Sequence, residues 1–79
     1  MATWDERWAQ ARRNLGRAVV DTGMTARIHN VKDFDCSVTF ENNGREYIKE
    51  NIDIATFEDE PSPELVRLVG NAKIALGLA

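Results

Sequence analysis

The spacing of apolar residues changes twice along this chain, and this change constrains the fold more than any other feature of the sequence. Near both ends, apolar side chains recur every three or four residues, which is the period of a helix with one buried face. Between about residues 24 and 54 they alternate with polar side chains, as in a half-buried strand. The pattern therefore predicts a helix, a β region and a second helix.

The first helix has clear start and stop signals. Thr3 is an N-cap and Glu6 follows three residues later, the spacing of a capping box in which each side chain binds a backbone N–H. Residues 21–23 (DTG) end the helix, because the glycine readily adopts the left-handed conformation that closes one. We interpret Trp4 and Trp8 as a lid on the core, with a binding hot spot as the alternative. We expect a helix over about residues 4–20 with a buried stripe of Trp4, Trp8, Ala11, Leu15, Ala18 and Val19.

The second helix follows the acidic segment FEDEPSPELV, residues 57–66. Ser62 is a natural N-cap, Pro63 needs no hydrogen-bond donor at the first helical position, and Glu64 favours the positive helix end. We expect a helix over about residues 63–76 with a buried stripe of Leu65, Leu68, Val69, Ala72 and Leu76. Three further apolar residues lie off this stripe. The helix is therefore either covered on several sides or meets a second copy of the chain in a homodimer through Val66, Ile74 and Leu78.

The alternating region divides into three predicted strands, residues 24–31, 36–41 and 45–54, with turn signals between them. Because short turns join consecutive strands as antiparallel neighbours, the three strands form an antiparallel meander. With the two helices packed on this sheet, the order α-β-β-β-α belongs to the α+β class. No repeat, low-complexity tract or linker interrupts the chain, so we expect a single domain over residues 1–79.

The hairpin between the second and third strands allows two registers. A two-residue turn at residues 43–44 would place Glu41 opposite Glu46, which is a repulsive pair. A turn with a glycine bulge would place Glu41 opposite Arg45 and bring two β-branched residues together, Val38 and Ile48. The sequence favours the bulged turn because it pairs opposite charges. In that register Ile48, Ile52 and Ile54 point toward the core, whereas Tyr47 and Lys49 point outward.

Length and composition indicate a small intracellular module and not an enzyme. The chain has 79 residues, 43% hydrophobic and 29% charged, which leaves little room for both a core and an enclosed substrate cavity. The single cysteine excludes an internal disulfide framework and fits a reducing compartment. The charged N-terminus does not resemble a signal peptide, and the most apolar stretch, LVRLVGNAKIALGLA, is interrupted by polar residues. We therefore expect a cytoplasmic protein without a cofactor.

A catalytic cysteine–histidine pair is the first candidate site that the sequence argues against. His29 and Cys36 are the only residues of their types, and such a pair can act as base and nucleophile. In the predicted strands, however, Cys36 points inward and His29 points outward. A buried cysteine usually behaves as a small hydrophobic residue.

A calcium loop is the second site that we discount. Asp33, Asp35 and Glu41 weakly resemble the start of an EF-hand loop. That loop requires glycine at its sixth position and glutamate at its twelfth, but here these positions hold Val38 and Gly44. The sequence therefore predicts neither a catalytic nor a metal site.

An uneven charge distribution is the feature that best predicts function. The net charge is −3, but residues 33–64 carry ten Asp/Glu against two Lys/Arg, which gives −8 in that segment. Such a surface is either only solubilising or a docking site for a basic protein partner, and complementary charge speeds and selects such association. We expect docking, with contacts from Asp33, Asp35, Glu41, Glu46, Tyr47, Glu50, Asp53, Glu58, Asp59 and Glu60.

Nucleic-acid binding or peptide reading is the alternative. Arg12, Arg13 and Arg17 on the first helix could neutralise phosphates, and residues 26–54 have a strand–turn rhythm similar to that of SH3-like or Tudor-like domains. A sequence pI near 5.0 argues against a dedicated nucleic-acid reader. Too few aromatic residues are available for a methyl-lysine cage, namely Phe34, Phe40, Tyr47 and Phe57.

The main expectation is a small non-enzymatic protein-binding module that acts through its acidic surface. Its partner would be a basic protein, including one whose basic groove otherwise holds nucleic acid. This profile of small size, acidity and absent catalytic motifs is similar to that of phage-encoded inhibitors such as anti-CRISPR proteins. The likeness is one of profile and rests on no shared motif.

Overall fold

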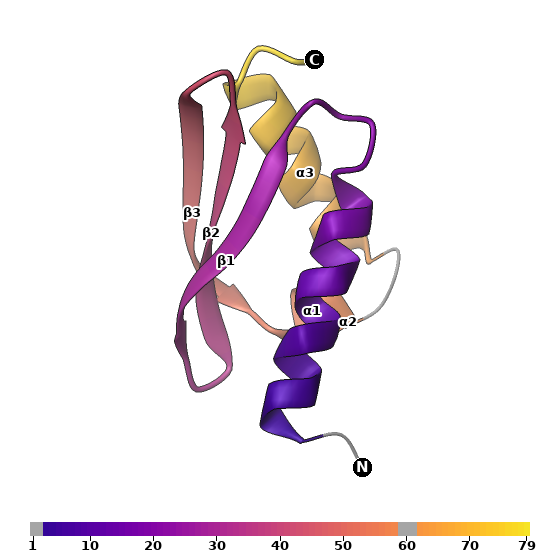
Figure 1. The fold of residues 1–79 in the computed structure, drawn as a ribbon, viewed down its shortest axis with the longest axis vertical. Coiled ribbons are helices and arrows are strands. Elements are labelled where there is room, and N and C mark those ends of the chain that lie inside the picture. The colour runs from indigo at the N-terminus through magenta and orange to yellow at the C-terminus, as the bar shows by residue number, and fades with distance from the viewer. Residues whose placement is uncertain (1–2, 59–61) are drawn as a thin grey trace.

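The computed structural model describes residues 3–58 and 62–79. Its elements follow the predicted order, with one short helix added before the last one (Figure 1). The three strands form one antiparallel sheet in the order β1-β2-β3, so the predicted α+β meander is confirmed. The elements are α1 (Trp4–Ala18), β1 (Thr25–Lys32), β2 (Asp35–Asn42), β3 (Arg45–Asp53), α2 (Ala55–Glu58) and α3 (Pro63–Ala75).

Both long helices begin at the predicted caps. Thr3 Oγ1 accepts a hydrogen bond from the Glu6 N–H at 3.2 Å, and Ser62 Oγ accepts one from the Leu65 N–H at 3.0 Å. Helix α1 ends at Ala18, two residues before its predicted end. The chain then turns through residues 19–24, where Asp21 (φ 62°) and Gly23 (φ 84°) are both left-handed. An aspartate tolerates this conformation better than most residues because its side chain is short and polar.

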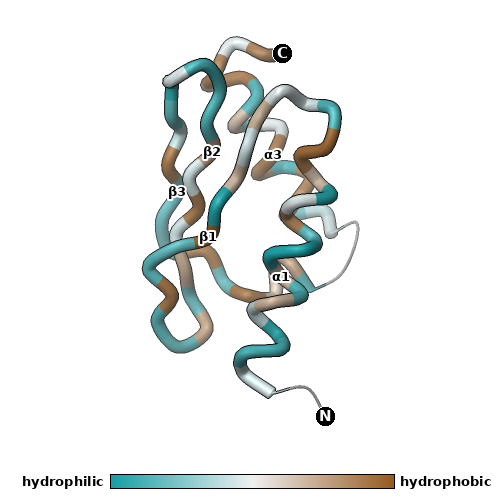
Figure 2. The backbone as a smooth tube through the Cα atoms, viewed as in Figure 1, coloured by the Kyte–Doolittle hydropathy of each residue, from teal (hydrophilic) through white to brown (hydrophobic). Residues whose placement is uncertain are grey.

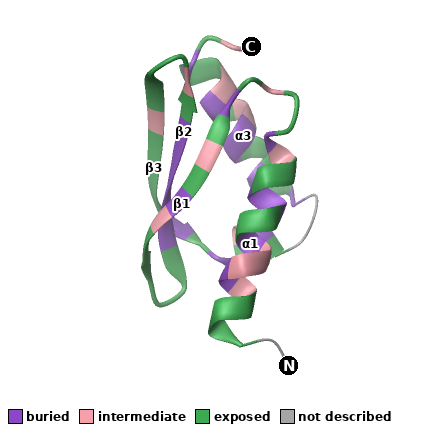
Figure 3. Cartoon of the chain, viewed as in Figure 1, coloured by how far each residue is buried: buried purple, intermediate pink, exposed green. Residues whose placement is uncertain are grey.

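Helices α1 and α3 both lie on the same face of the sheet, and α2 lies behind the lower half of α1 (Figure 1). Buried apolar residues of the sheet and the helices form one core. Apolar residues occur in both helices and in the sheet (Figure 2), and the middle of the central strand β2, residues 36–40, is buried (Figure 3). The largest fully buried side chains are Phe40, Phe57, Leu15, Ile54, Leu65 and Val38. The opposite face of the sheet, which we call the outer face, is not covered by a helix of the described residues. No helix in this part of the chain is both long and apolar enough to cross a bilayer.

The predicted register of the β2–β3 hairpin is wrong. The structure has the two-residue turn, in which Glu41 lies opposite Glu46 and Asn42 lies opposite Arg45. Asn43 (φ 51°) and Gly44 (φ 78°) are both left-handed, as a type I′ turn requires. This register places Phe40 opposite Tyr47 on the helix-covered face, with the ring centroids 6.2 Å apart. Burial of an aromatic pair therefore outweighs an exposed charge repulsion of a few tenths to about 1 kcal/mol.

The side-chain directions predicted for β3 are consequently wrong in its first half. Ile48 lies opposite Thr39 on the outer face and is 52% exposed, whereas Tyr47 and Lys49 lie on the helix-covered face. A bulge then restores the phase, because β3 has one residue more than β2 between the two pairs that flank it, Val38–Lys49 and Cys36–Ile52. Asn51 adopts φ 57° within this bulge. Ile52 and Ile54 therefore do enter the core, as predicted, with 7% and 1% exposure.

The two tryptophans differ in their burial. Trp8 is 2% exposed and belongs to the core, as predicted, whereas Trp4 is 38% exposed. Trp4 contacts Trp8 edge-to-face, with ring centroids 5.9 Å apart, and contacts the half-exposed Phe34 in the same manner at 5.1 Å. The Arg7 guanidinium lies over the Phe34 ring, 5.6 Å from its centroid. Trp4 and Phe34 thus form an exposed aromatic pair where α1 begins beside the β1–β2 turn.

Candidate functional site

The outer row of β3 is the clearest acidic feature of the described surface. Glu46, Ile48 and Glu50 follow one another at alternate positions and are all exposed. Glu46 and Ile48 lie opposite Glu41 and Thr39 on the outer face, and Glu50 lines a pocket together with Ser37, which belongs to the same face. The row therefore combines two carboxylates with an exposed apolar side chain between them.

A third carboxylate reinforces this row from the neighbouring strand. Glu41 lies directly opposite Glu46, and both are exposed. Residues that flank a two-residue turn form a hydrogen-bonded pair, so by alternation Glu41 and Glu46 form a non-hydrogen-bonded pair, whose side chains are closer. The only ion pair between described residues joins Arg7 and Glu58. The repulsion between Glu41 and Glu46 is therefore not relieved by a salt bridge within the described chain.

The carboxylates at the other end of the sheet have a partly structural role. Asp35 lies opposite Asp53, which is a second pair of like charges. Asp53 Oδ1 accepts a hydrogen bond from the Ala55 N–H at 2.8 Å and so caps the start of α2. Asp33 adopts φ 54° in the β1–β2 turn. Asp33 and Asp35 border a pocket of about 470 Å³, which is lined by Asn30, Lys32, Asp33, Asp35, Cys36, Ser37, Glu50 and Asn51.

Four of the predicted contact residues stand apart from these carboxylates. Glu58 is the last residue of α2 and forms the ion pair with Arg7 of α1. Tyr47 packs against the core from the helix-covered face and is only partly exposed. Asp59 and Glu60 lie outside the described residues. The predicted contact residues that lie on the sheet and the β1–β2 turn with exposed carboxylates are therefore Asp33, Asp35, Glu41, Glu46, Glu50 and Asp53.

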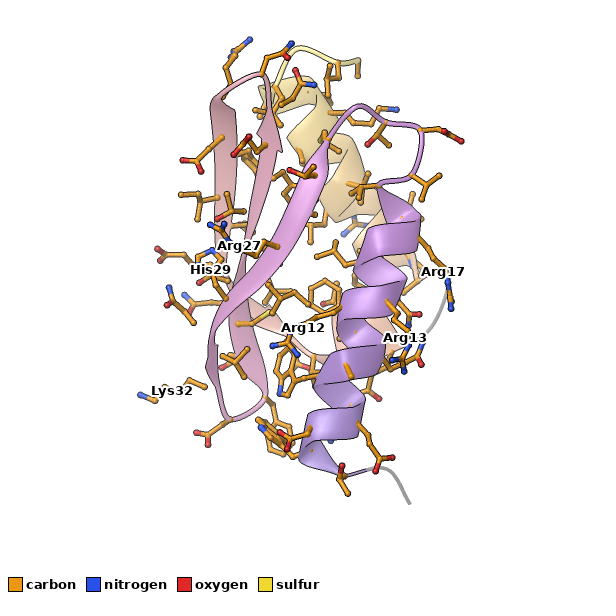
Figure 4. The ribbon with its side chains drawn as sticks, in the orientation of Figure 1. Arg12, Arg13, Arg17, Arg27, His29 and Lys32 are labelled. Carbon is orange, nitrogen blue, oxygen red and sulfur yellow. The ribbon has the colours of Figure 1, made fainter. Side chains whose placement is uncertain are left out.

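The arginines considered for nucleic-acid binding do not form one patch. Arg13 and Arg17 extend from α1 away from the sheet, whereas Arg12 extends toward β1 (Figure 4). Arg13 Nη2 donates to Gln10 Oε1 at 2.8 Å, and Arg17 Nη1 donates to Asn14 Oδ1 at 3.4 Å. Arg12 therefore points in a different direction from Arg13 and Arg17, and nucleic-acid binding through the three residues stays a prediction.

A row of basic residues on β1, which the sequence reasoning did not single out, shares the outer face with the acids. Figure 4 shows Arg27 and His29 extending over the outer face and Lys32 extending from the lower end of β1. Strands lie about 4.8 Å apart, so β1 and β3 are separated by about 10 Å, and no ion pair joins the two rows in the described chain. The outer face thus runs from basic on β1 to acidic on β3, with the hydroxyl groups of Ser37 and Thr39 between them.

His29 and Cys36 lie on opposite faces of the sheet, as expected. His29 Nε2 lies 2.7 Å from Thr39 Oγ1 on the outer face, whereas Cys36 is 2% exposed on the helix-covered face. Burial is the main cause that raises the pKa of the Cys36 thiol to about 11, and the nearby Asp35 and Asp53 carboxylates contribute to this shift against the opposing charge of Arg12. The thiol is therefore protonated at neutral pH and is a poor nucleophile. Among the described residues, no group of three or more His, Cys, Asp or Glu side chains could hold a metal ion.

Cys36 gives a pH-dependent prediction. An unfolded thiol has the ordinary cysteine pKa of 9.0, whereas the folded thiol has a pKa of about 11. Below pH 9 both states keep the proton, so the thiol adds no pH dependence; between pH 9 and 11 only the unfolded state loses it, and the free energy of unfolding should fall. Urea titrations across this range should show a shallower fall for Cys36→Ala. Equal slopes in the two proteins would contradict the assignment.

Two of the three residues predicted to form a homodimer face are exposed, and the third is not. Val66 and Ile74 are 59% and 69% exposed on α3, whereas Leu78 packs against the core. Val66 borders an apolar groove of about 360 Å³ between α1 and α3, which is lined by Ala18, Thr22, Leu65, Val66, Val69, Gly70 and Lys73. A homodimer through this face therefore stays a prediction.

Comparisons with protein-family models, curated proteins and solved structures find no match to this chain.

Proposed function

We propose that this chain is a non-enzymatic protein-binding module and that the β3 side of its sheet receives a basic surface of a protein partner. The observation that carries the proposal is the opposed pair Glu41 and Glu46, exposed and without a salt bridge in the described chain. Like charges directly opposite each other destabilise a sheet. A lysine or arginine from a partner would turn this repulsion into attraction.

Charge and shape together support a partner with a basic surface. Ile48 stands between Glu46 and Glu50 and offers an apolar contact that such an interface needs at its centre. The surrounding carboxylates would raise the association rate and discriminate against acidic partners. A groove that otherwise holds nucleic acid has the required charge, so an inhibitor that occupies such a groove is one form of this function.

The absence of catalysis is part of the proposal. The only histidine and the only cysteine lie on opposite faces of the sheet, and the thiol is both buried and protonated. A nucleophile without a base within hydrogen-bonding distance lacks the arrangement that covalent catalysis requires. These observations favour a role that depends on the surface and not on bond-making chemistry.

Charge reversal on β3 tests the proposed function. The double variant Glu46→Lys/Glu50→Lys should no longer retain its basic partner in affinity capture. Its free energy of unfolding should stay equal or rise by a few tenths of a kcal/mol, because Glu41 would then face a cation. Loss of binding without loss of stability would separate partner recognition from folding.

A matched variant controls for net charge. Glu6→Lys/Glu64→Lys adds the same four charges, from −3 to +1, in the first turns of α1 and α3. This variant should lose about 0.3–1 kcal/mol of stability at each helix start but should keep the partner. If the β3 variant and this control retain the same proteins, or if the unaltered chain retains no basic protein, the proposal fails.

A further inference from the structure

The β3 edge of the sheet pairs with no further strand of the described structure. β1 and β3 are the two edge strands, and α1 contacts β1, whereas β3 lies on the far side of the sheet from α1 (Figure 1). From Arg45 to Lys49 the pairing of β3 with β2 is regular, and the bulge begins only after this run. An edge with regular backbone geometry is a template on which another strand can pair.

The hairpin register determines which backbone groups point to this edge. The pair Asn42–Arg45 closes the two-residue turn and is hydrogen-bonded, so the pairs Glu41–Glu46 and Thr39–Ile48 are not. In an antiparallel ladder, the N–H and C=O groups of such residues point away from the neighbouring strand. Glu46 and Ile48 therefore direct their backbone groups toward the free edge and their side chains toward the outer face.

A second copy of the chain is a poor occupant of this edge. Two β3 strands that paired antiparallel about Ile48 would place Glu46 of each copy opposite Glu50 of the other. Paired about Tyr47, they would place Arg45 opposite Lys49. In both of these registers, two pairs of like charges would lie directly opposite each other. Charged side chains on an edge strand are a common means by which proteins avoid self-association.

We propose that the partner adds an extended segment to the β3 edge, with a basic, an apolar and a basic side chain at alternate positions. This inference rests on the proposed function and specifies how the basic partner binds. The backbone groups of Glu46 and Ile48 supply hydrogen bonds, Ile48 meets the apolar side chain, and Glu46 and Glu50 meet the two cations. Affinity then comes from the backbone, and selection comes from the alternating charges.

Peptide titration tests this inference on the intact chain. The probe is a short synthetic peptide with lysine, valine and lysine at alternate positions and threonine between them. The control is the same peptide in which the backbone amides that would face β3 are N-methylated. This change keeps the charge of the peptide but removes its N–H donors. In amide-resolved NMR, the unmodified peptide should slow hydrogen exchange at Glu46 and Ile48, and methylation should weaken binding about tenfold for two lost hydrogen bonds.

Each outcome separates this inference from the proposed function. Equal binding of the two peptides, or binding without protection of the β3 amides, overturns strand addition while the acidic docking surface stands. No binding of either peptide also overturns strand addition, and the affinity capture with the charge-reversed variants then decides the proposed function. Protection at Glu46 and Ile48 that disappears in Glu46→Lys/Glu50→Lys supports both.

Discussion

Replacement of Phe57 by alanine is expected to lower the free energy of unfolding by about 3–5 kcal/mol. Phe57 belongs to the short helix α2 and is fully buried among side chains of the core. Truncation removes the transfer free energy of the ring and leaves a cavity that the surrounding structure fills only in part. A domain of ordinary stability has about 5–15 kcal/mol in total, so the variant should be close to unfolding at room temperature.

Phe34→Ala is the matched control. It makes the same chemical change at a ring that is 52% exposed and contacts Trp4 and Arg7. The Phe34 ring contributes to stability mainly through its edge-to-face contact with Trp4. The variant should therefore lose no more than about 1 kcal/mol of unfolding free energy. Urea or thermal unfolding followed by circular dichroism measures both values. Similar losses in the two variants would show that α2 is not part of the core.

Replacement of Asn14 by leucine is expected to cost about 1–3 kcal/mol of unfolding free energy. Asn14 is 2% exposed, and its Nδ2 donates to the Phe57 carbonyl oxygen at 2.5 Å. Leucine has a similar volume but cannot donate, so it would leave a buried carbonyl without this partner. The hydrogen bond ties α1 to α2 and thereby fixes where the chain leaves the sheet for α3.

Gln10→Leu controls for this prediction. Gln10 Nε2 donates to Asn14 Oδ1 at 2.8 Å, so the control disturbs the same side chain but keeps the bond to Phe57. Because Gln10 is partly exposed, the variant should lose no more than about 0.5 kcal/mol of unfolding free energy. Denaturant titration of both variants gives the comparison. A loss at Asn14 no greater than at Gln10 would show that the bond to Phe57 contributes little.

The secondary structure could be predicted because local signals agree with the global fold. Thr3 and Ser62 cap their helices in the structure as the spacing indicates, and the change from helical to alternating periodicity marks both ends of the sheet. Helix α2 could not be predicted, since it has only four residues and Phe57 is the sole large apolar residue among them. Its partner Asn14 is a polar residue beside the apolar stripe, and only tertiary contacts reveal its burial.

The hairpin register was predicted wrongly because charge pairing was given more weight than burial. The favoured arrangement satisfied Glu41 with Arg45, but both positions are exposed, where such pairs contribute little. Tyr47 gains more by packing against Phe40, and the bulge at Asn51 lets Ile52 enter the core as well. A pattern of alternation alone cannot locate a bulge, although asparagine in the middle of a strand is a weak signal for one.

The candidate site could be predicted in composition but not in arrangement. The excess of carboxylates in residues 33–64 is countable in the sequence, and eight of them are exposed in the described structure, six of these on the strands and the β1–β2 turn. Their division between the hairpin and the opposite end of the sheet depends on the register. The same error hid Ile48, which was assigned to the core and instead lies exposed between two acids.

The bulge at Asn51 divides β3 into two parts whose side chains alternate between the two faces of the sheet in opposite phase. Upstream of it, even-numbered residues face solvent; downstream, even-numbered residues face the core, as Ile48 and Ile52 illustrate. The length of this segment is thus constrained as strictly as its composition. Deletion of one residue at the bulge would shift one part of β3 by one position. Either Ile52 and Ile54 would then become exposed, or Glu46 and Glu50 would become buried.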